Sequence, residues 1–396
     1  MKILLCHNHY AIRAGEDQVF ASEMQMLRAR GHTVISYTRD NADIASFSLF
    51  RKIQSVLFGI YNPRTVKDIK DIVRREQPDV AHVHNVFPLL SPSLYCALKS
   101  MQVPVVQTIH NFRFFCCNGL LLHGDTLCSP SPLLLLRCVF SRCYRNSFFY
   151  SAWYAAIIFW HRFRKTFVRC IDRYIVLNTF TRDVFIRNGF DQARIIVKPN
   201  AADVPELVSS GVHDYAVFIG RFSTEKGVIT LLDALKRLPA FPVKLIGSGP
   251  LDDYVKQAVS SKSFSHVELL GYLPFDECCR YAADALVSIF PSECYENCPL
   301  TVITSLWYGT PVVASHIGGI PDFVTEQAGW LFEPGNAEAL AERLQWIYTY
   351  RSDVIAMRDS VKAYARDRFS PDTNYRQLLA VYQSLVHDPA SDVSCE

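Results

Sequence analysis

The sequence has no apolar run long enough to cross a bilayer. A spanning helix needs about 20 consecutive apolar residues, and the longest candidate, SFFYSAWYAAIIFW at 147–160, is shorter and is flanked by arginines. The opening MKILLCHNHY also has neither the apolar stretch nor the cleavage site of a secretory signal peptide. We therefore expect a cytoplasmic protein in which 147–160 forms a buried or interfacial helix.

The cysteines do not complete a disulfide or zinc pattern. Their number, 13, is odd, and the chain of 396 residues is too large to need a disulfide framework. Cys116, Cys117 and Cys128 lie close together in sequence, but no second CxxC accompanies them. The loops that follow the expected strands also lack an Asp-x-Asp pair. We expect reduced thiols, no essential metal ion and no cofactor.

Other absences exclude whole classes of function. No GxGxxG with a later acid follows the first expected strand, which argues against an NAD-dependent oxidoreductase, and no GxxxxGK[ST] indicates a P-loop NTPase. The net charge of +3, with 49% hydrophobic and 20% charged residues, is typical of a folded globular protein. Nothing in this balance indicates a nucleic-acid partner, and we expect none.

The pattern that is present is an alternation of strands and helices. Near-continuous apolar strands such as KILLC and VPVVQTI alternate with amphipathic segments, and the alternation restarts at YAVFIGR after a turn-rich stretch at 200–214. This pattern predicts an α/β protein with two doubly wound parallel sheets. We expect four regions: an N-terminal domain at 1–200, its basic aromatic insertion at 133–169, a second domain at 214–370, and a C-terminal helix and tail at 371–396.

The loops after the strands carry the candidate site, because ligands of open α/β sheets bind beyond the carboxyl ends of strands. In GRFSTEKGV (220–228), Arg221 and Lys226 lie between a strand and a helix. Two cations and a helix N-terminus suit a diphosphate. The alternative is a solvated pair that only flanks a turn.

Further positions beside expected strands and helix starts follow the same logic. Pro299 is expected as the first residue of a helix, which leaves the amide of Leu300 available to a ligand, and Glu296 precedes that helix as either a ligand contact or a simple cap. His110 ends a strand of the first domain, where a satisfied core histidine is the alternative. Gly15 opens the first helix, where backbone can approach a ligand closely.

These residues resemble a known family. GRFSTEKG, GSGPL and PSECYENCPLTVITSLWYGTPVVASHIGGIPDFV are similar to the donor-domain motifs of glycosyltransferase family 4, and HNHYAIRAGED and VVQTIHNFRFFC extend the likeness into the first domain. The resemblance implies a retaining, nucleotide-sugar-dependent hexosyltransferase of the glycosyltransferase-B fold, with two Rossmann-like domains facing a cleft. The first domain would bind the acceptor and the second the nucleotide-sugar donor.

The resemblance also implies roles for single residues. Arg221 and Lys226 match the pair that holds the donor diphosphate, Glu296 matches the first acid of the E-x7-E signature, and His110 matches a contact to the transferred sugar. Gly15 matches the second glycine of a Gly-Gly pair whose first member here is Ala14. The remaining donor contacts implied are Gly249, Leu273, Asn297, Pro299 and Leu300.

One position departs from the family pattern. Thr304 stands where the family has its second glutamate, which accepts both ribose hydroxyls. A threonine cannot make a bidentate carboxylate contact, and losing a charge-assisted bond of this kind costs roughly 1.5–3 kcal/mol. The sequence leaves three alternatives open: a weakened transferase, a binding or regulatory homologue, and a nucleotide-sugar epimerase.

The segment 137–169 has seven basic residues and no acidic one, interleaved with aromatic residues. A cationic amphipathic segment is typical of proteins that bind the surface of an anionic membrane. The alternative is a helical insertion packed on the sheet with exposed arginines. We expect a glycan or lipid-linked acceptor and a peripheral location on the inner face of the membrane.

Overall fold

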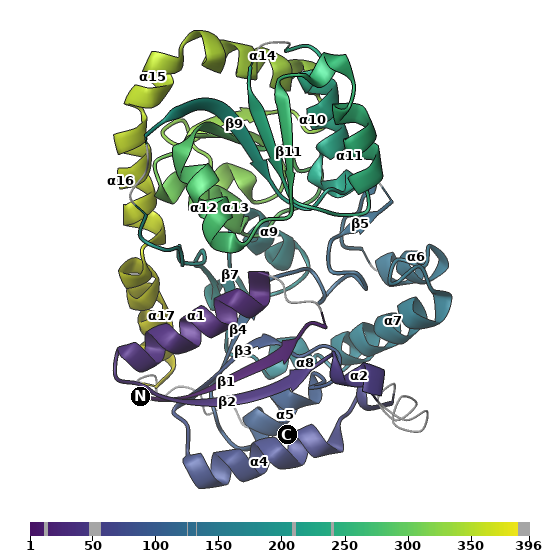
Figure 1. Cartoon of the computed structure of the whole chain (residues 1–396). Helices are drawn as coiled ribbons and strands as arrows, with labels where there is room; N and C mark the ends of the chain where they lie inside the picture. Colours follow the sequence, from purple (N-terminus) through teal and green to yellow (C-terminus); the bar gives the residue numbers. More distant parts are fainter. Residues whose placement is uncertain are drawn as a thin grey trace. The chain divides into compact units, whose positions relative to one another are not determined.

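The computed structural model describes residues 1–11, 15–46, 57–124, 126–131, 133–207, 211–238 and 241–386 (Figure 1). Ala14 and the tail from 387 onward lie outside these ranges. The chain divides into two compact units. Unit 1 contains Met1–His123, Cys128–Pro199 and Asn374–Glu396, and unit 2 contains Gly124–Leu127 and Asn200–Thr373.

Unit 1 is built on a six-stranded parallel sheet of order β2-β1-β3-β4-β7-β8. Its strands are β1 (Lys2–His9), β2 (Thr33–Asp40), β3 (Val80–Asn85), β4 (Val105–Ile109), β7 (Arg173–Val176) and β8 (Ile195–Val197). Its helices are α1 (Gly15–Ala29), α2 (Asp43–Ser46), α4 (Pro63–Glu76), α5 (Ser93–Ser100), α6 (Leu134–Phe140), α7 (Phe148–Phe163), α8 (Thr166–Arg169), α9 (Thr179–Arg187) and α17 (Pro371–Val386). All six residues of β3 are buried, as expected for a strand inside a parallel sheet.

Unit 2 repeats this plan with the strand order β11-β10-β9-β12-β13-β14, again parallel. Its strands are β9 (His213–Ile219), β10 (Val243–Ile246), β11 (Val267–Gly271), β12 (Ala285–Phe290), β13 (Val312–Ser315) and β14 (Gly329–Phe332). Its helices are α10 (Val228–Leu235), α11 (Asp252–Val259), α12 (Phe275–Asp284), α13 (Leu300–Trp307), α14 (Ala337–Thr349), α15 (Arg351–Ala356) and α16 (Arg358–Phe369). Two short strands, β5 (Leu122–His123) and β6 (Thr126–Leu127), lie outside both large sheets. The predicted α/β class with two parallel sheets is confirmed.

The C-terminal helix predicted within 371–396, whose docking the sequence left open, packs on unit 1. Leu378, Val381 and Tyr382 of α17 are buried in one apolar cluster with Ile3, Leu5 and Phe20. The hydroxyl of Tyr382 also lies 2.7 Å from Nδ1 of His82 on β3. The amphipathic pattern predicted this helix, but periodicity alone does not say which core receives the apolar face.

The basic aromatic insertion forms the helices α6, α7 and α8 of unit 1, and α6 packs against α7. Helix α7 starts at an N-cap, Ser147, whose hydroxyl accepts a hydrogen bond from the amide of Tyr150. Tyr154, Ile157 and Ile158 of α7 are buried. Among the described residues, no helix is both long and apolar enough to span a membrane.

Candidate functional site

In unit 2, the loops after the neighbouring strands β9 and β12 meet through an ion pair. Nζ of Lys226 lies 2.5 Å from Oε1 of Glu296, and the same oxygen accepts a hydrogen bond of 2.8 Å from Oγ of Ser292. The two charged side chains are 29% and 14% exposed, so solvent screens the pair only partly. Burial opposes the charge of Lys226, but Glu296 raises its pKa above the ordinary value, so the ammonium persists at neutral pH.

Glycines let the backbones of these loops touch. A Cβ on Gly227 would lie 1.8 Å from the carbonyl oxygen of Pro291, and its φ of +69° also favours glycine. A Cβ on Gly318, after β13, would lie 3.0 Å from the amide nitrogen of Glu296, and the amide of Gly319 donates to the carbonyl of Glu296 over 3.0 Å. The Gly-Gly pair of SHIGG therefore supports the backbone that carries Glu296.

Arg221 follows β9 as predicted, but its guanidinium is engaged within its own loop. It forms an ion pair with Glu225 and remains 59% exposed. Burial raises the pKa of Glu225, but the hydrogen bonds it accepts and the charge of Arg221 together outweigh burial and lower that pKa overall. Glu225 and Ser223 thus engage part of the guanidinium, whose five N–H donors leave others for a ligand.

Pro299 is the N-cap of α13, and the helix begins at Leu300, so the expectation that Pro299 is its first residue is wrong by one position. Pro299 has an extended backbone with a ψ of 102°, and its carbonyl oxygen accepts hydrogen bonds from the amides of Val302 and Ile303. No described side chain caps this helix end, and Glu296 points instead to Lys226. The interpretation of Glu296 as a simple cap is therefore wrong.

The remaining predicted donor contacts occupy the same edge of the unit 2 sheet or the helix that follows it. Gly249 follows β10, and its amide donates to Oδ1 of Asp252 over 2.6 Å. Leu273 follows β11 and is half-buried. Asn297 is buried beside Glu296, and Thr304 is buried within α13 at 6% exposure.

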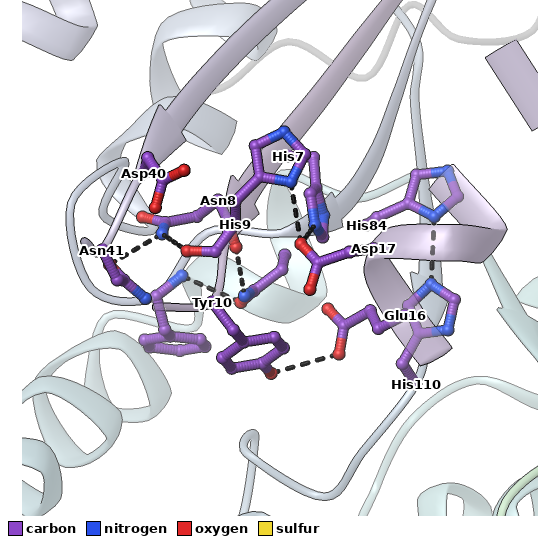
Figure 2. A network of polar contacts seen from close by, with 12 residues as sticks. His7, Asn8, His9, Tyr10, Glu16, Asp17, Asp40, Asn41, His84 and His110 are labelled. Carbon is purple, nitrogen blue, oxygen red and sulfur yellow. Dashed lines mark hydrogen bonds and ion pairs between the residues drawn. The ribbon is translucent and has the colours of Figure 1, made fainter. Parts of the chain in front are cut away.

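In unit 1, His110 directly follows β4 and joins a group of polar side chains that the sequence reasoning did not assemble (Figure 2). Nε2 of His110 lies 3.0 Å from Nδ1 of His84 on β3. His84, His110, Asn111 and Arg113 line part of a small pocket within this unit. Burial lowers the pKa of His110 well below its ordinary value, so the ring is neutral at pH 7.

Two acids at the start of α1 complete this network and were missed. Oδ1 of Asp17 lies 3.0 Å from Nε2 of His7 and 2.7 Å from Nδ1 of His9 (Figure 2). Oε2 of Glu16 accepts hydrogen bonds from Tyr10 and Asn111. Burial raises the pKa of Glu16 to about 8. Gly15, the predicted residue, is exposed beside them as the first residue of α1.

A signal for this network existed in the sequence. The pairs His7/His9 and His82/His84 are spaced by two, so each pair lies on one face of its strand. Acids are also enriched in the first turn of helices. The trios His7/His9/Asp17 and Glu23/His82/His84 each bring three possible ligand atoms within 4.8 Å of one another, so both could hold a metal ion. The contacts within both trios are of hydrogen-bonding length, and the expected absence of a metal stays a prediction.

Comparison with known proteins finds a glycosyltransferase family model for each unit. Residues 213–349 match the family described as Glycosyl transferases group 1, and residues 18–205 match Glycosyltransferase Family 4. An uncharacterised glycosyltransferase of Methanocaldococcus jannaschii is 31% identical over 205 residues, which are 51% of this chain and 58% of that protein. The amylovoran biosynthesis glycosyltransferase AmsK of Erwinia amylovora is 28% identical over 179 residues, 42% of this chain and 44% of that protein. The chain thus spans about half the length of the curated relatives it matches.

Solved structures share the fold over nearly the whole chain. HepE of Anabaena, crystallised with UDP, superposes with a TM-score of 0.67 at 16% identity and covers 97% of this chain and 100% of its own. Sucrose-phosphate synthase of Thermosynechococcus elongatus gives a TM-score of 0.70 at 18% identity, covering 97% and 98%. At such identities the likeness establishes the fold alone.

Proposed function

Because the chain belongs to the family 4, group 1 glycosyltransferases, we propose that it transfers a hexose from a nucleoside diphosphate sugar to an acceptor hydroxyl with retention of configuration. The observation that carries the proposal is the Lys226–Glu296 pair, which fixes a cation at the carboxyl edge of the unit 2 sheet. HepE was crystallised with UDP and with UDP-glucose. The naming of AmsK for amylovoran biosynthesis favours a polysaccharide or glycolipid product.

The chemistry required is stabilisation of a leaving diphosphate. As the bond between the anomeric carbon and the phosphate oxygen breaks, its electron pair stays on the diphosphate, and the acceptor oxygen bonds to the anomeric carbon on the same face. The acceptor proton goes to the departing phosphate oxygen. Lys226, Arg221 and the amides at the start of α13 would stabilise the developing negative charge. These groups would do this without a metal ion.

A ligand screen tests the donor part of the proposal. We expect UDP, GDP or ADP, or one of their sugars, to raise the melting temperature of the purified protein, because ligands that bind only the folded state stabilise it. Glu296→Gln should retain the fold and weaken that shift, because Lys226 then loses its charged partner. If no nucleoside diphosphate or nucleotide sugar shifts the melting temperature, the donor assignment is wrong.

A second candidate, a binding or regulatory homologue with weak catalysis, is favoured by Thr304. This side chain is 6% exposed on α13, so an added carboxylate would be poorly hydrated unless a ligand met it. We expect Thr304→Glu to lower the stability of the free protein and to tighten donor binding by about one to two decades. Donor binding without transfer in the wild type, combined with transfer in Thr304→Glu, would favour the second candidate.

We also propose that α6 and α7 bind the cytoplasmic face of an anionic membrane, where a lipid-linked acceptor would be presented. Phe140, Phe149 and Phe163 are 75%, 83% and 70% exposed. The same two helices also expose Leu136, Phe148, Tyr150, Phe159 and Trp160. Isolated exposed apolar residues are ordinary, but a group on two packed helices indicates a binding surface. The seven basic residues of 137–169 match anionic headgroups.

Vesicle sedimentation tests this surface. The protein should pellet with vesicles containing anionic lipid at low salt, and less so at high salt, because screening weakens the electrostatic part. The double variant Phe149→Ser/Phe163→Ser should pellet poorly. Tyr272→Ser is the matched control, since Tyr272 is 77% exposed in unit 2. Equal sedimentation with zwitterionic vesicles, or loss of binding in the control, would contradict the proposal.

A further inference from the structure

We propose that Glu23 and His84 form a buried hydrogen-bond relay that determines which ring nitrogen of His110 carries a proton. The inference rests on the proposed function, in which His110 contacts the transferred sugar. Oε1 of Glu23 lies 3.2 Å from Nε2 of His84. Nδ1 of His84 lies 3.0 Å from Nε2 of His110, the contact drawn between the two rings in Figure 2.

The relay is held in place from several elements of unit 1. Glu23 lies on α1, His84 on β3, and His110 directly after β4. Glu23 and His84 are 7% and 3% exposed. His82, two residues before His84, lies 2.8 Å from the same oxygen of Glu23. The other ring nitrogen of His82 lies 2.7 Å from the hydroxyl of Thr108, so this anchor is itself fixed.

The charge state of Glu23 sets the direction of the relay. Burial opposes its ionisation, but its pairing with His82 and His84 holds the pKa of Glu23 well below the ordinary value. An ionised carboxylate only accepts hydrogen bonds. Nε2 of His84 must therefore be the donor in its contact with Glu23.

The direction then propagates to His110. Burial lowers the pKa of His84 to about 4, so its ring is neutral at pH 7 and has one donor and one acceptor nitrogen. Since Nε2 of His84 donates to Glu23, Nδ1 of His84 is the acceptor nitrogen of that ring. The proton in the His84–His110 contact therefore belongs to Nε2 of His110. His110 is neutral as well, so its Nδ1 carries no proton.

The consequence is a defined chemical preference at the sugar contact. Nε2 of His110 is occupied by His84, and the nitrogen left for a ligand is an acceptor that suits a sugar hydroxyl. A site whose buried nitrogen accepts a hydrogen bond from a sugar hydroxyl rejects an analogue without that hydroxyl. The buried acceptor would then have no hydrogen-bond donor. Glu23 and His84 act through His110 and are therefore positioning residues.

The same cluster has one competing interpretation, a bound metal ion. Glu23, His82 and His84 offer ligand atoms within 4.8 Å of one another. The distances of 2.8 and 3.2 Å from Glu23 to the two rings are those of hydrogen bonds. A metal on His84 Nε2 would displace its proton and break the relay, so metal content is one outcome of the test.

Nitrogen NMR of the full-length protein with 15N-labelled histidine reads the tautomer directly and needs no substrate. The His110 signals are assigned by their loss in His110→Gln. We expect Nδ1 of His110 to appear as an unprotonated nitrogen and Nε2 as a protonated one at pH 7. In Glu23→Gln, which can both donate and accept, the two signals should move toward each other. In Tyr382→Phe, which removes a hydroxyl from the same cluster but no link of the relay, they should stay unchanged.

Kinetics provide the second readout. Glu23→Gln should lower kcat by about ten- to a hundredfold, the effect of one hydrogen bond to a charged group. The donor KM should change less than about threefold, because the relay does not bind the diphosphate. Tyr382→Phe should keep kcat within about twofold of the wild type.

Three results would overturn the relay: a protonated Nδ1 in the wild type, an unchanged His110 tautomer in folded Glu23→Gln, or one equivalent of metal in the purified protein that Glu23→Gln loses. The wild-type spectrum decides the question even if Glu23→Gln fails to fold. Absence of transfer with every donor would contradict the proposed function, and the spectrum would still test the relay.

Discussion

The two units present their polar residues at the same edge of similar sheets but build them in different ways. In unit 2, the loops after β9, β12 and β13 meet through backbone contacts at Gly227 and Gly318, with one lysine–glutamate pair between them. In unit 1, side chains from β1, β3, the end of β4 and α1 form a buried network of histidines and acids (Figure 2). The arrangement in unit 2 depends on the close approach of backbones, and the arrangement in unit 1 depends on which histidines and acids carry protons.

The two units should therefore respond to different perturbations. Unit 2 should be sensitive to a single added methyl group and to loss of one charge. Unit 1 should be sensitive to pH and to the hydrogen-bonding capacity of single side chains. Variants in each unit can therefore test whether the two sites differ in this way.

The largest effect is expected for Gly227→Ala. The new Cβ would meet the carbonyl oxygen of Pro291 at 1.8 Å, and backbone on both sides cannot yield. We expect a loss of more than about 3 kcal/mol in the free energy of unfolding of unit 2 and at least a hundredfold loss of transfer. Gly335→Ala is the control, since φ of Gly335 is +76° but no atom of the described residues lies within 4 Å of the added Cβ. It should cost about 1 kcal/mol. Equal costs in urea unfolding would show that the close contact is unimportant.

Lys226→Ala should come next. The variant removes the cation fixed by Glu296, and removing one group that stabilises developing charge typically costs about 10²–10³ in rate. Transfer assays should show this loss in kcat/KM. Lys236→Ala is matched to it, because Lys236 pairs with Asp233 at 2.7 Å on the surface, and it should change the rate less than about twofold. A Lys226→Ala enzyme with normal turnover would remove unit 2 from the proposed chemistry.

A pH titration of stability should distinguish unit 1. Burial raises the pKa of Glu16 to about 8, whereas an unfolded glutamate titrates near 4.5, so the folded protein binds the extra proton between these values. Stability from this group is therefore present below about pH 4.5 and is lost as the pH rises to 8, at up to about 1.4 kcal/mol per pH unit. Between pH 6 and 8, the wild type should lose about 2–3 kcal/mol more than Glu16→Gln. Parallel stability curves for the two proteins would contradict this assignment.

The smallest effect is expected for a pair of hydroxyl deletions. Tyr382→Phe removes a contact to His82 in unit 1, and Tyr308→Phe removes a hydrogen bond of 2.6 Å to the carbonyl of Pro205 in unit 2. Each should cost about 1 kcal/mol, confined to its own unit. Hydrogen exchange measured by mass spectrometry reads both units at once. Faster exchange in both units from either variant would show that they do not open separately.

The sequence predicted the candidate site of unit 2 better than that of unit 1. The alternation of strands and helices predicted both sheets, and the contiguous motifs of unit 2 predicted the loops that hold Lys226 and Glu296. The contact between those two residues, 70 positions apart, was beyond local patterns. Pro299 was placed one position inside α13 because proline suits both positions sterically.

Unit 1 was less predictable for a physical reason. Each histidine in a strand is individually compatible with an ordinary satisfied core residue, and only the parallel register of β1, β3 and β4 brings them together. Glu23 reaches His84 across 61 positions of sequence. His110 was identified from its place after a strand, whereas its partners required the packed structure.

The discontinuous composition of unit 1 has a consequence for synthesis of the chain. Its core includes Leu378, Val381 and Tyr382, which are made after all of unit 2. On the ribosome, residues 200–373 emerge before the last helix of unit 1, so unit 2 can complete its core while unit 1 still exposes the surface that α17 will cover. A fragment ending at Pro199 would leave that apolar surface permanently uncovered. Supplying residues 374–396 as a separate peptide should cover the surface and so complete the core of unit 1.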